Sequence, residues 1–252
     1  AAVFKKYLTD FTDAEIKYCC ESAYNDKKFA TENIAELSHL FEGTYILELW
    51  HGPTCAFKDM ALQILPYLLT TSTKKMHLNK KVVILVATSG DTGKAALEGF
   101  KDVEGTSIMV FYPQEGVSPM QKRQMTTQEG SNVSVCAING NFDDAQSGVK
   151  AIFTNEEIKA KLDKASMMFS SANSINWGRL APQIVYYISA YATLVKDEEI
   201  KADPEMLTKS RLLKLLVKKQ YVKLREVTEE EQPADLAELL EELDENNRLV
   251  VF

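Results

Sequence analysis

Stretches of consecutive apolar residues alternate with stretches of helical apolar spacing in the middle of this chain, and this alternation constrains the fold more than any other feature. Residues 82–87 form an unbroken apolar run of the kind found in strands covered on both faces, and residues 107–112 and 133–138 are two further strand-like runs. Helical spacing follows the first run at residues 94–100 and separates the other two around residues 120–128. Strands that alternate with helices predict an α/β domain with a mostly parallel sheet.

The residues before this pattern predict two helices and one more strand-turn-helix unit. Apolar side chains in the first forty residues have helical spacing, with Thr12 and Asp13 as candidate helix-start residues. Residues 44–50 are rich in β-forming types, and after a break at residues 51–54 helical spacing resumes between residues 60 and 68. We expect a strand, a turn and a helix here.

The composition changes after Gly178, which is the last glycine of the chain. Residues 180–195 could still form a core helix of the α/β region, whereas the polar residues up to Pro204 predict a connection. Leucines at helical spacing beyond it predict short amphipathic helices. We therefore divide the chain into an α/β region, residues 1–196, and a helical tail, residues 204–252.

Charge and composition exclude several classes of function. The formal net charge of -7 argues against a nucleic-acid or anionic-membrane surface, because both require a clustered basic face. No apolar stretch approaches the roughly 20 residues needed to cross a bilayer, and the first ten residues lack the order of a signal peptide, so we expect a cytoplasmic protein. The four cysteines and three histidines have no metal-site or disulfide spacing, which predicts free thiols and no metal. The oligomeric state stays open.

Lys58 is the first candidate for chemistry. It follows the turn His-Gly-Pro-Thr (residues 51–54), stands beside Phe57 and comes at the expected start of a helix. An amine partly removed from water there would favour the neutral form that a Schiff base or a proton shuttle needs. On position alone, a solvated helix lysine is the simpler interpretation.

The second candidate is the segment Ala-Thr-Ser-Gly-Asp-Thr-Gly-Lys-Ala (residues 87–95), which joins a buried strand to a helix. Glycines let the backbone approach a ligand closely, and the N–H groups of a helix N-terminus favour an anion. The alternative is an ordinary turn in which Asp91 or Thr92 is the N-cap.

Taken together, these two segments resemble the threonine synthase family, which belongs to the pyridoxal-phosphate enzymes of the tryptophan-synthase-like fold (fold type II). The resemblance covers roughly residues 1–196 and continues through residues 112–113, 116–124, 140–144 and 174–179. It implies a partial fold type II domain that uses pyridoxal 5'-phosphate as its cofactor.

The resemblance also implies roles for individual residues. The lysine at the position of Lys58 forms the internal Schiff base with the cofactor, and Phe57 and Asp91 lie with it at the cofactor. The residues implied in substrate binding are Thr88, Ser89, Thr92, Asn176 and Arg179. For every one of these residues except Lys58, the alternative of a purely structural turn residue stays open.

The reaction implied is that of a lyase of threonine biosynthesis, which converts O-phosphohomoserine and water to threonine and phosphate. The cofactor ring serves as an electron sink, Lys58 moves protons, and the guanidinium of Arg179 suits the departing phosphate. A related pyridoxal-phosphate lyase such as a dehydratase is the alternative enzyme, disfavoured because residues 50–54 and 173–179 match threonine synthase in particular.

Two features depart from the family pattern. Complete members carry a later glycine-rich loop for the cofactor phosphate, and no glycine follows Gly178, so the resemblance implies a chain incomplete at both ends with impaired turnover. Residues 232–244 instead resemble the N-terminal cytoplasmic helical domain of MgtE-type magnesium transporters; an unrelated helical tail is the alternative. A non-catalytic fusion fragment, in which residues 206–252 act as a helical interaction module, is the competing hypothesis of a different class.

Overall fold

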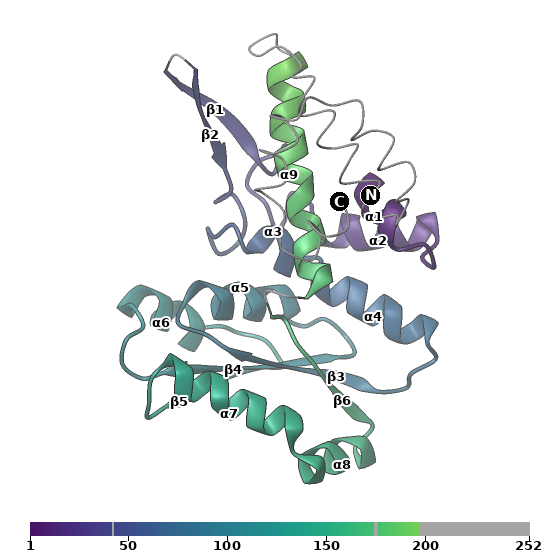
Figure 1. The fold of residues 1–252 in the computed structure, drawn as a ribbon, viewed down its shortest axis with the longest axis vertical. Helices are drawn as coiled ribbons and strands as arrows, with labels where there is room; N and C mark the ends of the chain where they lie inside the picture. Colours follow the sequence, from purple (N-terminus) through teal and green to yellow (C-terminus); the bar gives the residue numbers. More distant parts are fainter. Residues whose placement is uncertain (42, 174–175, 197–252) are drawn as a thin grey trace, which may run out of the picture. The chain divides into compact units, whose positions relative to one another are not determined.

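The computed structural model describes residues 1–41, 43–173 and 176–196 (Figure 1). The chain divides into two compact units, Ala1–Tyr191 and Ala192–Phe252. Every described helix and strand lies in the first unit, apart from the end of its last helix. The helical tail predicted for residues 204–252, its resemblance to a transporter domain and its role as an interaction module lie outside the described residues.

A four-stranded, fully parallel sheet forms the centre of the first unit, which confirms the predicted α/β class. Its strands are β3 (Lys81–Ala87), β4 (Thr106–Pro113), β5 (Val133–Ile138) and β6 (Met167–Ser170), in the order β5-β4-β3-β6. Strand β6 was not predicted from the sequence. With four residues this strand is too short to show a period, and its extended form depends on pairing with β3.

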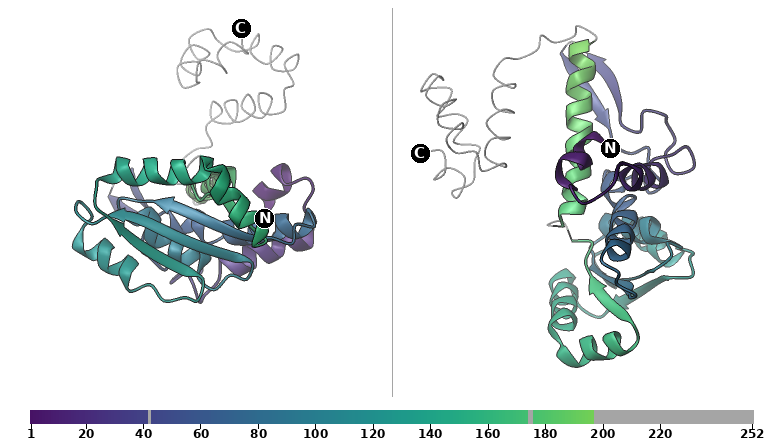
Figure 2. Two further views of the ribbon diagram at one scale, coloured as in Figure 1. Left: turned by 90° about the horizontal axis from the view of Figure 1, so that it is seen from below. Right: turned by 90° about the vertical axis from the view of Figure 1, so that its right-hand side faces the viewer.

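Helices cover both faces of this sheet. In Figure 1 helices α4 (Leu65–Lys75) and α5 (Asp91–Phe100) lie on one side, and α7 (Phe142–Thr154) and α8 (Glu156–Lys164) lie on the other; Figure 2 shows the same layers from two further directions. Helix α6 (Pro119–Thr126) packs beside α5. The main core forms where α5 meets the sheet, and its fully buried side chains include Leu97, Phe100, Ile84, Ile108 and Val110.

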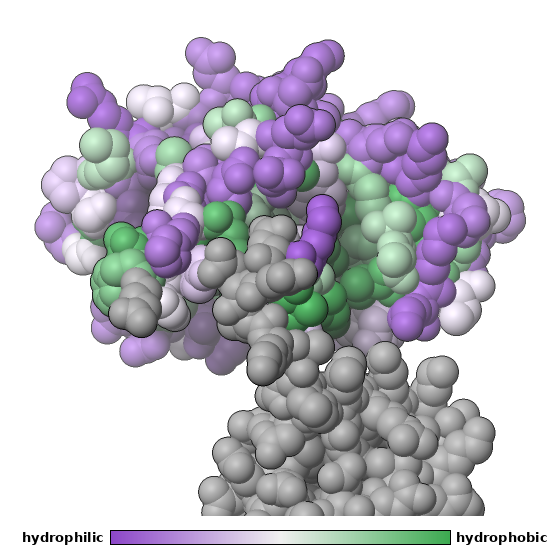
Figure 3. Space-filling model, turned by 90° about the horizontal axis from the view of Figure 1, so that it is seen from above, coloured by the Kyte–Doolittle hydropathy of each residue, from purple (hydrophilic) through white to green (hydrophobic). Residues whose placement is uncertain are grey.

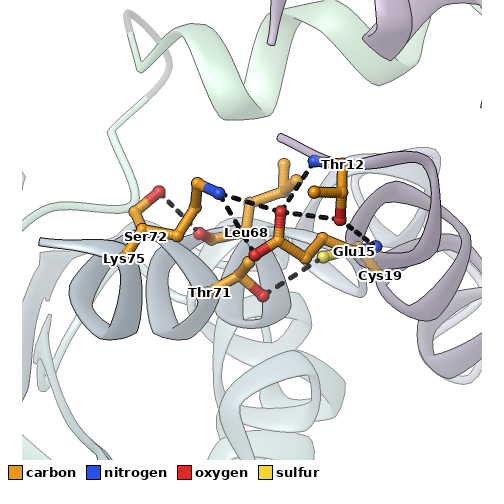
Figure 4. Close-up of polar contacts among 7 residues, drawn as sticks. All are labelled: Thr12, Glu15, Cys19, Leu68, Thr71, Ser72 and Lys75. Carbon is orange, nitrogen blue, oxygen red and sulfur yellow. Dashed lines mark hydrogen bonds and ion pairs between the residues drawn. The ribbon is translucent and has the colours of Figure 1, made fainter. Parts of the chain in front are cut away.

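The N-terminal helices are α1 (Ala2–Tyr7) and α2 (Asp13–Ala23). The predicted helix start is confirmed, because Thr12 is the N-cap of α2 and forms a capping box with Glu15. Helix α2 packs on α4, and Figure 4 shows the polar contacts that join them. Lys75 Nζ donates to both carboxylate oxygens of Glu15 at 3.0 and 3.2 Å, and Cys19 Sγ lies 3.5 Å from Thr71 Oγ1.

The expected strand at residues 44–50 forms, but in a different setting. Strand β2 (Thr44–Glu48) pairs antiparallel with β1 (Glu36–Phe41) in a separate two-stranded hairpin rather than entering the parallel sheet. The helical spacing assigned to the first forty residues therefore does not hold at β1, which begins at Glu36. Helical spacing over a few residues does not exclude a strand, and β1 is extended because its partner lies three residues further along the chain.

Two further helices complete the described part, α3 (Asp59–Leu62) and α9 (Trp177–Lys196). A core helix was one interpretation of residues 180–195, yet much of the apolar surface of α9 is exposed, including Leu180, Ile184 and Ile188. Apolar residues also gather on the face of the molecule seen in Figure 3. Neither α9 nor any other described helix has the length and apolar character that crossing a membrane requires.

Candidate active site

Lys58 stands at the N-cap position of α3, at the end of a tightly held loop. The side chain of Asp59 is fully buried and accepts hydrogen bonds from Thr54 N at 2.8 Å and from Thr54 Oγ1 at 2.7 Å. Burial raises the pKa of Asp59, and these hydrogen bonds act in the opposite direction. Gly52 packs so closely on Asp59 that a Cβ there would collide with its carboxylate. The two ends of the loop before Lys58 are therefore in direct contact, through Gly52 and Thr54 on one side and Asp59 on the other.

The side chain of Lys58 is largely shielded from water, unlike the solvated helix lysine that its position alone favoured. It is 19% exposed, and its Nζ lies 3.5 Å from Asp91 Oδ2. The same Nζ lies 4.8 Å from the centre of the Phe57 ring, which is itself exposed. A carboxylate and an aromatic face thus flank the amine.

The segment after β3 is organised by a single hydroxyl. The buried Thr88 Oγ1 accepts from Gly90 N at 3.0 Å and from Gly93 N at 2.9 Å, and donates to Gly90 O at 3.1 Å. Gly90 has φ +159° and is the N-cap of α5, with Asp91 as the first helical residue. The alternative that Asp91 or Thr92 caps this helix is therefore wrong, because the Thr88 hydroxyl occupies the capping role from inside the turn.

The two segments meet at a cavity of about 190 Å³. It brings together five of the predicted site residues, Lys58, Thr88, Ser89, Asp91 and Thr92. The remaining lining residues are Ala87, Gly90, Gln121 and Phe142.

Sequence reasoning missed Gln121 and Phe142 as site residues. Gln121 is four residues before the fully buried Met125 on α6, and this spacing places both on one helix face. Phe142 is the first residue of α7, directly after the capping residue Asn141. Both lie in segments that resemble the threonine synthase family, and this resemblance was the signal that could have identified them as site residues.

A larger cavity of about 530 Å³ lies beside α8 and β6 and contains none of the predicted residues. Its charged side chains already have partners: Lys80 pairs with Asp163, and Lys159 pairs with Glu156 at 2.8 Å. We assign the chemistry to the smaller cavity, because there the shielded amine of Lys58, the Asp91 carboxylate and the N-terminus of α5 converge with the predicted loop residues.

Asn176 and Arg179 do not line the cavity of Lys58. Asn176 donates to Ser171 O at 2.8 Å and accepts from Gly178 N at 2.9 Å, so it shapes the connection into α9. Arg179 is 6% exposed and donates to Ala172 O at 3.0 Å, and burial lowers its pKa. No carboxylate in the described ranges forms an ion pair with this guanidinium.

No protein-family model matches the chain. Individual relatives do match it, and those described below are threonine synthases or threonine synthase-like proteins. Threonine synthase of Pseudomonas aeruginosa is 44% identical over 178 residues, and threonine synthase-like 1 of Homo sapiens is 40% identical over 192 residues. These alignments cover 71% and 74% of this chain, but only 36% and 25% of the two relatives.

A solved structure shows the same likeness in three dimensions. The structure of a pyridoxal-phosphate-bound threonine synthase from Brucella melitensis superposes with a TM-score of 0.66 at 38% identity. The superposition covers 77% of this chain and 41% of that one. The predicted fold class, an α/β arrangement of fold type II, is therefore confirmed over the described part of the chain.

Proposed function

Because the chain is threonine synthase-like in sequence and fold, we propose that it binds pyridoxal phosphate through Lys58 and acts as a lyase on O-phosphohomoserine, forming threonine and phosphate. The observation that carries this proposal is the shielded amine of Lys58, which faces a cavity bounded by the Thr-Ser-Gly-Asp-Thr loop. The hydroxyls of this loop and the N-terminus of α5 suit an anionic ligand.

The residues around Lys58 fit the reactive end of the cofactor. Its shielded amine can bind the aldehyde carbon and can take up or release a proton at Nζ. When bound, pyridoxal phosphate supplies an electron sink for charge that develops on the substrate. Asp91 holds the amine in place, and the Phe57 ring lies against it.

Two features support binding of the substrate's anionic groups. The N–H groups of Asp91 and Thr92 in the first turn of α5 point toward its N-terminus, where Ser89 and Thr92 add hydroxyl donors at the cavity. Arg179 is a buried cation with no carboxylate partner in the described residues, and a buried charge of this kind is stabilised when an anion pairs with it. We assign Asn176 the task of holding the backbone next to Arg179.

The experiment is to incubate the purified chain with pyridoxal phosphate, reduce it with borohydride and locate the modified lysine by mass spectrometry. We expect modification at Lys58 and none there in Lys58→Ala. Lys94→Ala is the matched control, since this lysine is similarly shielded but pairs with Glu98 and lies outside the cavity lining. Modification distributed evenly over the lysines would contradict the proposal.

A second measurement separates the two enzyme classes. Phosphate release from O-phosphohomoserine is expected for a threonine synthase, whereas ammonia release from serine is expected for a dehydratase. If Lys58 is modified but only ammonia is released, the cofactor assignment stands and the substrate assignment is wrong.

A further inference from the structure

Helix α6 is fixed against α5 in a way that directs Gln121 at the candidate site. Ser118 caps the helix by accepting a hydrogen bond from Gln121 N at 3.3 Å. One turn further on, Met125 is fully buried and lies against Gly93 of α5, where a Cβ would collide with its sulfur. Gln121 shares the face of Met125, so the same packing turns it toward the start of α5.

Both polar atoms of the Gln121 amide form hydrogen bonds. Its Nε2 donates to Asp91 Oδ1, and its Oε1 accepts from Ser118 Oγ at 3.1 Å. It also lies directly over Gly90, where a Cβ would collide with the amide group. A Ser-x-x-Gln sequence is the signature of a capping box, in which the glutamine would turn back to the N-cap N–H. In this protein the Gln121 amide donates to Asp91 instead.

Asp91 needs such a support because its side chain is 47% exposed. In the part of the chain that the structure describes, its carboxylate has two side-chain partners, Gln121 at Oδ1 and Lys58 at Oδ2. Without the first bond, the carboxylate can rotate into water. We propose that Gln121 is a positioning residue that holds the Asp91 carboxylate against the Lys58 amine and thereby controls how readily this amine reacts.

The inference rests on the proposed function only in that it concerns the same lysine, so it is tested on the chain without cofactor. The probe is acetic anhydride at trace concentration, with the acetylation rate of Lys58 followed by mass spectrometry and that of Lys94 as an internal reference. An amine held against a carboxylate is less free to attack the reagent and reacts slowly. We expect Gln121→Met to speed acetylation of Lys58 by about 1.5- to 5-fold, the range for an ion pair of this exposure.

Two controls separate positioning from a general structural effect. Gln124→Met makes the same change on the same helix outside the cavity lining and is expected to leave the rate unchanged. Asp91→Asn is expected to speed the reaction as Gln121→Met does, and the double variant is expected to equal Asp91→Asn alone, since Gln121 acts through Asp91. Gln121→Asn, whose amide is one methylene shorter, replaces Gln121→Met if thermal unfolding shows that the latter is not folded.

An unchanged or slower rate in the folded Gln121 variant would overturn the inference, as would additive effects in the double variant. These outcomes are distinct from failure of the proposed function. A chain in which pyridoxal phosphate never modifies Lys58 would refute the cofactor assignment and leave the acetylation result intact.

Discussion

At the scale of single residues, the contact between Thr54 and Asp59 determines the geometry from which Lys58 projects. Thr54 supplies both a backbone and a side-chain donor to the buried carboxylate, and four residues separate it from Asp59. A buried carboxylate that loses a donor retains its desolvation cost without the compensating bond. The position of Lys58 therefore depends on a hydrogen bond made by a neighbour that lies outside the cavity lining.

We expect Thr54→Val to lower the free energy of unfolding by about 1–3 kcal/mol, because it removes the hydroxyl donor to Asp59 while keeping the shape of the side chain. Urea denaturation followed by circular dichroism measures the change. Thr54→Ser is the matched variant, which restores the donor and should recover most of the loss. Equal losses in the two variants would show that packing, rather than the hydrogen bond, stabilises the loop.

At the scale of elements, α2 and α4 are joined by a carboxylate that has two partners. Glu15 accepts from Thr12 N at 2.7 Å within the capping box and from Lys75 across the helix pair (Figure 4). The hydrogen bond from the Thr12 backbone, followed by that from Lys75, lowers the pKa of Glu15. An acid with a lowered folded-state pKa stabilises the fold above its unfolded-state pKa, and this contribution disappears as the pH falls through the folded-state value.

The lowered pKa of Glu15 predicts that part of the pH dependence of the unfolding free energy comes from this residue. Glu15→Gln keeps a capping-box side chain but loses the charge, so it should be less stable than the unmodified chain at neutral pH. The difference should shrink as the pH falls below 4.5, the ordinary pKa of glutamate. Thermal unfolding across pH 3–7 is the measurement. Glu21→Gln, on the exposed side of the same helix, should show little difference at any pH.

At the scale of the whole molecule, helix α9 packs against segments from the first third of the chain. Its Tyr186 is buried with Phe29 and Met60, so it joins α9 to the helix that follows Lys58. The next residue, Tyr187, is 65% exposed although the two rings lie 4.7 Å apart. Adjacent tyrosines therefore have opposite environments.

The pair gives a test of how α9 is oriented. We expect Tyr186→Ala to lower the free energy of unfolding by about 3–5 kcal/mol, as for other large side chains in a core. Tyr187→Ala should change it by less than about 0.5 kcal/mol. Guanidinium denaturation of the two variants provides the comparison, and similar losses in both would mean that α9 is rotated relative to the described packing.

Most of the parallel sheet could be predicted from sequence, because its signals are local. The apolar runs of β3, β4 and β5 and the helices between them were located to within a few residues. The hairpin strand β1 and the edge strand β6 could not, since each is extended only through a partner elsewhere in the chain. A pattern within one segment carries no information about such a partner.

The candidate site divides in the same way. The sequence by itself determined Lys58 and the loop from Thr88 to Thr92, because a glycine-punctuated turn between a strand and a helix is a local pattern with a recognisable family resemblance. Only the tertiary structure decided that Gln121 and Phe142 line the same cavity and that Arg179 does not. The physical reason is that a parallel sheet gathers the ends of its strands at one edge, so residues distant in the chain converge through packing that no single segment encodes.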